Sequence, residues 1–293
     1  MLIWGLMYPA TKYVVQVIDP VFIAFVRYCI ATLSLMPFFV VDMGRRKTRI
    51  GSRDALAMSA LGLFGVTGFS VCLTIGIKLS TAANSALLVN TQPILTALIA
   101  PLLIKEYTSL VRIVGAVFGL VGIYFLVSGG LRIGQVFQPE YFLGNVLLLS
   151  AALLFSLYSI FVKRYVSKYG GLAPTFLSMA AGTVLLIPAL FVGSGPSFRS
   201  MNLVHWALLL YIGVAATAVA NLLLNQSFHH LGVVRAMGFK FLIPVFGFVL
   251  SVILLQEKPG IVDYIGAGIV VLSVLLIQNA RVLQSAQRKK TNS

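Results

Sequence analysis

Apolar residues run through the chain in ten long stretches, which charged and turn-forming residues separate. A helix that crosses a membrane needs about 20 mainly apolar residues. The pattern therefore predicts ten transmembrane helices, near residues 1–18, 20–41, 55–77, 81–103, 109–128, 141–162, 172–192, 203–227, 232–254 and 261–280.

Three residues of the first half recur in the second half at a constant separation of 151 residues. The matched pairs are Pro93 and Pro244, Glu106 and Glu257, and Gly115 and Gly266. Because each half holds an odd number of helices, the second half enters the membrane inverted, which is a common plan in secondary transporters. The sequence thus predicts an all-α integral membrane protein with ten transmembrane helices in two inverted five-helix repeats.

Composition agrees with a membrane location. The chain is 59% hydrophobic and 10% charged, with a mean hydropathy of +0.98 and a net charge of +15. Most of the Lys and Arg excess falls in alternate loops, as the positive-inside rule requires, and it therefore does not indicate nucleic-acid binding. We expect a multi-pass protein of the plasma (inner) membrane with both termini cytoplasmic and the lipid bilayer as its surroundings.

Several short motifs match a known family. The matching residues are Trp4-Gly5, Lys12, Pro20, Arg27-Tyr28, the segment 79–86 before Pro93, Lys105-Glu106, Gly115 to Gly122, Lys163, Pro244, Glu257 and Gly266. The chain resembles the EamA-type transporters of the drug/metabolite transporter superfamily in the order and spacing of these residues.

This resemblance implies a fold and a function. The fold would consist of one five-helix EamA repeat over 1–130 and a second over 141–282, followed by a cytoplasmic tail over 283–293. In such a bundle three helices of each half surround a central cavity, and the fifth helix of each half is more peripheral. Family members move small organic solutes by alternating access.

The paired prolines indicate where a solute could bind. Proline lacks a backbone donor and displaces the carbonyl four residues earlier, so Pro93 and Pro244 free the carbonyls of Val89 and Lys240. Inside a bilayer a freed carbonyl must face protein, water or ligand. A plain helix kink is the alternative interpretation of either proline, but discontinuous helices at matched places favour a binding site.

Lys240 is the most informative polar residue, because an ammonium near the middle of a membrane costs at least ~2.5 kcal/mol. It would face a cavity or extend toward the cytoplasmic surface. For Lys12 the alternative to substrate contact is a structural role. For Asn221 and Asn225 the alternative is hydrogen bonding between helices. The predicted substrate-binding residues are Lys240, Asn90, Thr91, Gln92, Pro93, Pro244, Tyr8, Lys12, Asn221 and Asn225.

The seven acidic residues lie at predicted helix ends or in loops. For Glu106 and Glu257 we expect ion pairs with Arg112 or Lys258, with a gating role as the alternative. Cations without matching acids in the core favour a substrate that carries a carboxylate. No pattern of catalytic residues, metal ligands or cofactor-binding residues is present.

The sequence therefore predicts a transporter and no enzyme. We expect a secondary transporter that exports a small polar metabolite, such as an amino acid or an organic anion, by alternating access around a central cavity. A monomer or weak homodimer is expected, with no cofactor and no nucleic-acid partner. The alternatives are an integral-membrane enzyme acting on a lipid-linked substrate and a passive solute channel.

Overall fold

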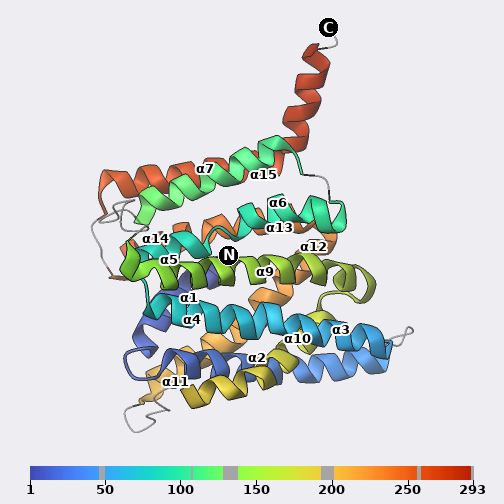
Figure 1. Ribbon diagram of the computed structural model, residues 1–293, viewed down its shortest axis with the longest axis vertical. Coiled ribbons are helices and arrows are strands. Elements are labelled where there is room, and N and C mark those ends of the chain that lie inside the picture. Colours follow the sequence, from blue (N-terminus) through green and yellow to red (C-terminus); the bar gives the residue numbers. More distant parts are fainter. Residues whose placement is uncertain (46–49, 107, 128–137, 193–200, 256–258, 292–293) are drawn as a thin grey trace.

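The structure is a computed structural model that describes residues 1–45, 50–106, 108–127, 138–192, 201–255 and 259–291. Within these ranges, side chains are not described at positions 8, 9, 12, 82, 83, 192, 251, 254, 255 and 281–291. Every regular element in the described ranges is helical, and most of the helices run side by side (Figure 1).

Nine helical segments in the described residues are long and apolar enough to cross a membrane. They are Pro20–Arg45, Ser52–Lys78, Asn84–Ile104, Leu110–Val127, Pro139–Tyr169, Leu172–Phe191, Leu203–Leu231, Val233–Leu250 and Ile261–Ala280. The chain is therefore a multi-pass integral membrane protein. The first predicted stretch, 1–18, contains α1 (Leu2–Val14), whose 13 residues make it shorter than the other nine.

Five of the nine segments are built around one main helix: α2 (Pro20–Arg45), α7 (Leu110–Val127), α9 (Phe142–Tyr169), α10 (Leu172–Leu186) and α15 (Ile261–Thr291). The short 3-10 turns η2 (Pro139–Tyr141) and η3 (Ile187–Val192) flank α9 and α10. The other four segments are α3 (Ser52–Gly62), η1 (Leu63–Gly68) and α4 (Phe69–Lys78); α5 (Ala82–Val89) and α6 (Gln92–Ile104); α11 (Leu203–Leu210), η5 (Tyr211–Val219) and α12 (Ala220–Leu231); and α13 (Val233–Gly238), η6 (Phe239–Phe241) and α14 (Leu242–Leu255).

The two helices that carry the paired prolines are interrupted next to them. α5 ends at Val89, and α6 begins at Gln92 with Pro93 in its first turn, where a missing N–H has no consequence. In the second half the 3-10 turn η6 separates α13 from α14, and Pro244 follows in the first turn of α14. The predicted interruptions are thus confirmed, and Lys240 lies inside one of them.

Two π-helical segments also lie at matched positions. Adding the 151-residue separation to η1 gives positions 214–219, which fall inside η5. A π-helix is rare, and when present it is often found near functional sites. Each half of the chain therefore contains one π-segmented helix and one helix interrupted near a proline.

The last helices of the two halves, α7 and α15, pack side by side at one end of the molecule (Figure 1). A Cβ atom added to Gly122 would lie 2.8 Å from the backbone N of Val270, and one added to Gly119 would lie 2.6 Å from Ser273 Oγ. Gly119 and Val270 are 151 residues apart, as are Gly122 and Ser273. The contact is therefore reciprocal between the halves.

This close packing gives a first prediction. We expect Gly122→Ala to destabilise the protein by about 1–3 kcal/mol, because the new methyl group would collide with the α15 backbone. Gly268→Ala is the matched control, since an added Cβ there meets nothing within 4 Å. Thermal unfolding in detergent should show a lower apparent Tm for Gly122→Ala alone. An unchanged Tm would mean that the helices can separate slightly without cost.

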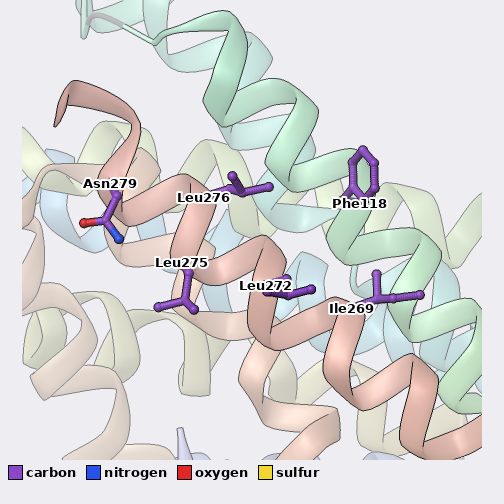
Figure 2. A pocket seen from close by; sticks show the side chains of 6 residues that line it. All are labelled: Phe118, Ile269, Leu272, Leu275, Leu276 and Asn279. Atoms are coloured by element: carbon purple, nitrogen blue, oxygen red, sulfur yellow. The ribbon is translucent and has the colours of Figure 1, made fainter. Parts of the chain in front are cut away.

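A groove of ≈ 390 Å³ lies between α7 and α15. Figure 2 shows the side chains that line it. Its lining residues are Phe118, Ile269, Leu272, Leu275, Leu276 and Asn279. The lining is almost entirely apolar, and Phe118, Leu272 and Leu275 are more than half exposed. Such a surface suits contact with lipid chains and offers little to a polar solute. The candidate site lies elsewhere, around Lys240.

Candidate functional site

The Lys240 ammonium lies between two aromatic rings and an amide. Its Nζ is 3.9 Å from the ring centroid of Phe155 in α9 and 5.5 Å from that of Trp4 in α1. Lys240 also donates a hydrogen bond to Oε1 of Gln92, the first residue of α6. Aromatic faces and an amide oxygen stabilise a cation that has left water. Four elements from both halves therefore meet at one ammonium group.

No acidic side chain neutralises this ammonium within the described parts of the chain. The salt bridges found there join Lys163 to Glu106 and Lys168 to Asp54. A buried cation without a counter-ion is costly, and a membrane protein retains it when it serves a function. The site therefore presents positive charge to whatever enters it.

Trp4 is held in place from the π-helix of the second half. Its Nε1 donates a 2.7 Å hydrogen bond to the carbonyl oxygen of Ala216 in η5. The π-segment thus contributes to the site by fixing the indole that faces Lys240. Sequence reasoning could not select Phe155, because that contact crosses 85 positions of the chain.

Gln92 is almost completely buried, at 2% exposure. Its backbone carbonyl accepts hydrogen bonds from Thr96 Oγ1 (2.8 Å) and from Ser156 Oγ of α9 (3.1 Å). Its side-chain Nε2 has no hydrogen-bond partner among the described residues. The backbone is thus anchored to α9, while one amide donor remains unused.

The other polar residues of the α5–α6 break bond back to their own helix. Asn90 Nδ2 donates to the Ala86 carbonyl (2.6 Å), and Thr91 Oγ1 donates to the Leu88 carbonyl (2.6 Å). Short polar side chains commonly satisfy nearby backbone groups in this way. Their predicted contact with substrate would therefore require these hydrogen bonds to be exchanged.

Asn225 lies in a second, fully buried polar cluster. Its Nδ2 donates to Tyr158 OH of α9 and to Thr175 Oγ1 of α10, both at 2.8 Å, and Tyr158 OH lies 3.3 Å from Ser178 Oγ. The cluster joins three helices, which is the alternative role considered for this residue. Asn221 Nδ2 donates to the carbonyl of Thr217 in its own segment.

The remaining predicted site residues are less informative. Pro93 is buried and Pro244 is half-buried. The side chains of Tyr8 and Lys12 lie outside the described residues, so their predicted roles stay predictions. The structure therefore brings Lys240 and Gln92 together and adds Trp4 and Phe155 to them.

Glu106 connects the first half to two helices of the second half. Its Oε2 pairs with Lys163 Nζ of α9 at 2.5 Å and accepts from the backbone N–H of Val233 at 3.2 Å. Its Oε1 accepts from the N–H of Val234, also at 3.2 Å. Gly232, at φ +80°, permits this approach, since a Cβ there would lie 2.6 Å from Oε1. We call this set of contacts the Glu106 junction.

The partner found for Glu106 differs from the expectation. The sequence named Arg112 or Lys258 for the two matched glutamates, whereas the structure gives Glu106 the more distant Lys163. Glu257 and Lys258 lie outside the described residues.

Asp54 of α3 makes a second contact with α9. Its Oδ2 accepts hydrogen bonds from Lys168 Nζ at 2.7 Å and from Tyr169 OH at 2.6 Å. The end of α9 thus holds α3 and α6.

Comparison with known proteins places this architecture in context. The EamA-like transporter family matches residues 1–128 and 142–278. The uncharacterized transporter YyaM of Bacillus subtilis is 23% identical over 92% of this chain and 88% of its own length. An uncharacterized transporter of Archaeoglobus fulgidus is 26% identical over 94% and 93%.

Two further similarities are relevant. A protein of Streptantibioticus cattleyicolor, named a probable terminal-alkyne amino-acid exporter, is 24% identical over 90% of this chain and 89% of its own. One solved crystal structure superposes with a TM-score of 0.79 at 19% identity, covering 94% of this chain and 92% of its own. That similarity shows a shared fold.

Proposed function

Because the chain belongs to the EamA-like transporter family of the drug/metabolite transporter superfamily, we propose that it exports a small polar metabolite by alternating access around Lys240. Membership of this family makes the chain a transporter rather than an enzyme, as its sequence predicted. The observation that carries the proposal is the partly buried Lys240 ammonium, which faces two aromatic rings and an amide without an acidic partner among the described residues. An amino acid or an organic anion suits such a site.

Alternating access in this proposal depends on ten helices arranged as two inverted repeats. Three features support it: the helix interruptions beside Pro93 and Pro244, the π-segments η1 and η5, and the reciprocal packing of α7 against α15. The hydroxyl oxygens of Thr32 and Thr183, which are 151 residues apart, also lie 3.4 Å from each other. Residues at the axis of a two-fold relation meet their own equivalents in this way.

The proposed exporting direction rests on one relative. The Streptantibioticus cattleyicolor protein is named an amino-acid exporter, and it is similar over most of both chains. This similarity supports an amino acid or a related carboxylate as the cargo. The predicted monomer or weak homodimer remains a prediction, which light scattering of the purified protein would measure.

The proposed orientation places the protein in the plasma (inner) membrane with both termini in the cytoplasm. The Glu106 junction and the Asp54–Lys168 pair join residues that the charge bias assigns to the cytoplasmic side. In this orientation both contacts would hold the cytoplasmic ends of α3 and α6 against α9. The conformation described would then be closed on that side.

Transport in proteoliposomes tests the proposal. Purified protein is reconstituted, vesicles are loaded with radiolabelled amino acids or organic acids, and release is followed against protein-free vesicles. We expect saturable release of at least one solute, accelerated by the same unlabelled solute on the opposite side. A protein that responds to no gradient in the panel, or that shows unitary conductance in planar bilayers, would refute alternating-access export.

A further inference from the structure

Gln92 offers a ligand group that the contacts described so far leave unused. Its Oε1 accepts a hydrogen bond from Lys240, and its Nε2 has no partner among the described residues although the residue is only 2% exposed. Buried polar groups in native proteins are nearly always hydrogen-bonded, so an exception needs an explanation. A ligand that accepts a hydrogen bond from Nε2 supplies one.

The orientation of this amide is fixed from two sides. The Gln92 backbone is bound to α9 through Ser156 and to its own helix through Thr96. The side-chain oxygen is committed to Lys240, because an ammonium group can only donate hydrogen bonds. The amide nitrogen must therefore be the other atom of the same amide group, next to the oxygen that accepts from the ammonium.

Two neighbouring donors, one of them cationic, specify the group that fits. A carboxylate has two acceptor oxygens and a negative charge, so it can accept from Lys240 Nζ and Gln92 Nε2 together. A carboxamide would place its own NH₂ against one of these donors, and an amine would meet the ammonium charge. Phe155 and Trp4 leave apolar ring faces beside the same position.

We propose that Gln92 and Lys240 form a two-point site for the carboxylate group of the transported solute, in which Gln92 distinguishes a carboxylate from the corresponding carboxamide. This inference rests on the proposed function for its cargo. It assigns Gln92 a role in specificity that differs from the positive charge supplied by Lys240.

The test compares ligand pairs on purified, detergent-solubilised protein. L-alanine, L-leucine, L-phenylalanine and phenylacetate are each titrated beside their carboxamides, and affinity is obtained from the ligand-induced rise in apparent Tm. We expect at least one carboxylate to bind the unaltered protein tenfold or more tightly than its carboxamide. If no carboxylate is preferred, the inference is wrong.

Two substitutions separate recognition from structure. Gln92→Glu places a carboxylate beside Lys240, so it should weaken carboxylate binding at least tenfold and reverse the preference. Gln92→Met removes the Nε2 donor. It should reduce the preference for a carboxylate over its carboxamide about tenfold, because the carboxamide NH₂ no longer faces a donor. Gln226→Glu makes the same chemical change at a residue outside the site and is the matched control. Gln226 is exposed, and its Oε1 accepts from the Gly171 N–H at 2.8 Å. General damage would weaken both members of a ligand pair equally.

The outcomes distinguish this inference from the proposed function. If Gln92→Met and Gln92→Glu keep the original preference, Gln92 does not contact the ligand and the inference fails, even where transport is intact. If the preference changes as expected but no solute is transported in vesicles, the carboxylate site stands and the transport proposal fails.

Discussion

Lys240→Met is expected to lower the apparent affinity for the transported solute about 10- to 150-fold, without lowering expression. A hydrogen bond to a charged group contributes about 1.5–3 kcal/mol, which corresponds to this range. Folding should tolerate the change, because methionine packs well against aromatic rings such as Phe155 and Trp4 and carries no charge that needs solvation. Initial rates of solute release from proteoliposomes, measured across a concentration series, provide the test.

Two variants control this experiment. Lys78→Met removes an exposed lysine at the end of α4 and should leave transport unchanged. Lys240→Arg keeps the charge but alters its shape and should retain part of the affinity. If Lys240→Met shows the original saturation and rate, the lysine takes no part in transport.

Glu106→Gln is expected to open the side of the bundle that the Glu106 junction closes and to lower the free energy of unfolding by about 1–3 kcal/mol. The substitution breaks the ion pair with Lys163 and weakens the acceptor for the Val233 and Val234 amides. Because these contacts join α6 to α9 and α13, their loss should favour conformations in which the ends separate. The apparent Tm should fall accordingly.

A buried cysteine can report the opening. Ser159 of α9 lies one turn before Lys163 and is fully buried, so Ser159→Cys introduces a protected thiol. In a background where Cys29 and Cys72 are alanine, an impermeant maleimide should label this cysteine several-fold faster in Glu106→Gln. Glu140→Gln is the control, because Glu140 is exposed in η2, just before α9. Equal labelling in both variants would mean that the Glu106 junction only stabilises helix ends.

The sequence predicted the parts of the site that follow from helix geometry. Proline chemistry placed interruptions beside Pro93 and Pro244, and the membrane cost of an ammonium selected Lys240. Both expectations depend only on local sequence and on the bilayer. Both arguments point to the helix interruptions beside Pro93 and Pro244, and Gln92 and Lys240 meet there through a hydrogen bond.

Contacts between distant helices were not predictable in the same way. Phe155 is one of many phenylalanines, and only the folded arrangement of the helices brings its ring to Lys240. For Glu106 the sequence favoured Arg112, six positions away, whereas the helical bundle brings Lys163 closer. Asn90 and Thr91 were expected to face a solute, but their side chains reach their own backbone first. Tertiary packing decides each of these cases.

The position equivalent to Lys240 in the first half is Val89, which ends α5. A symmetric pair of identical short chains could not make this distinction, because any lysine in one copy would appear in the other. Two ammonium groups in one water-poor site would repel each other strongly. When the two halves belong to one polypeptide, one half can carry a lysine where the other carries a valine. The site then holds one positive charge and suits a singly charged group.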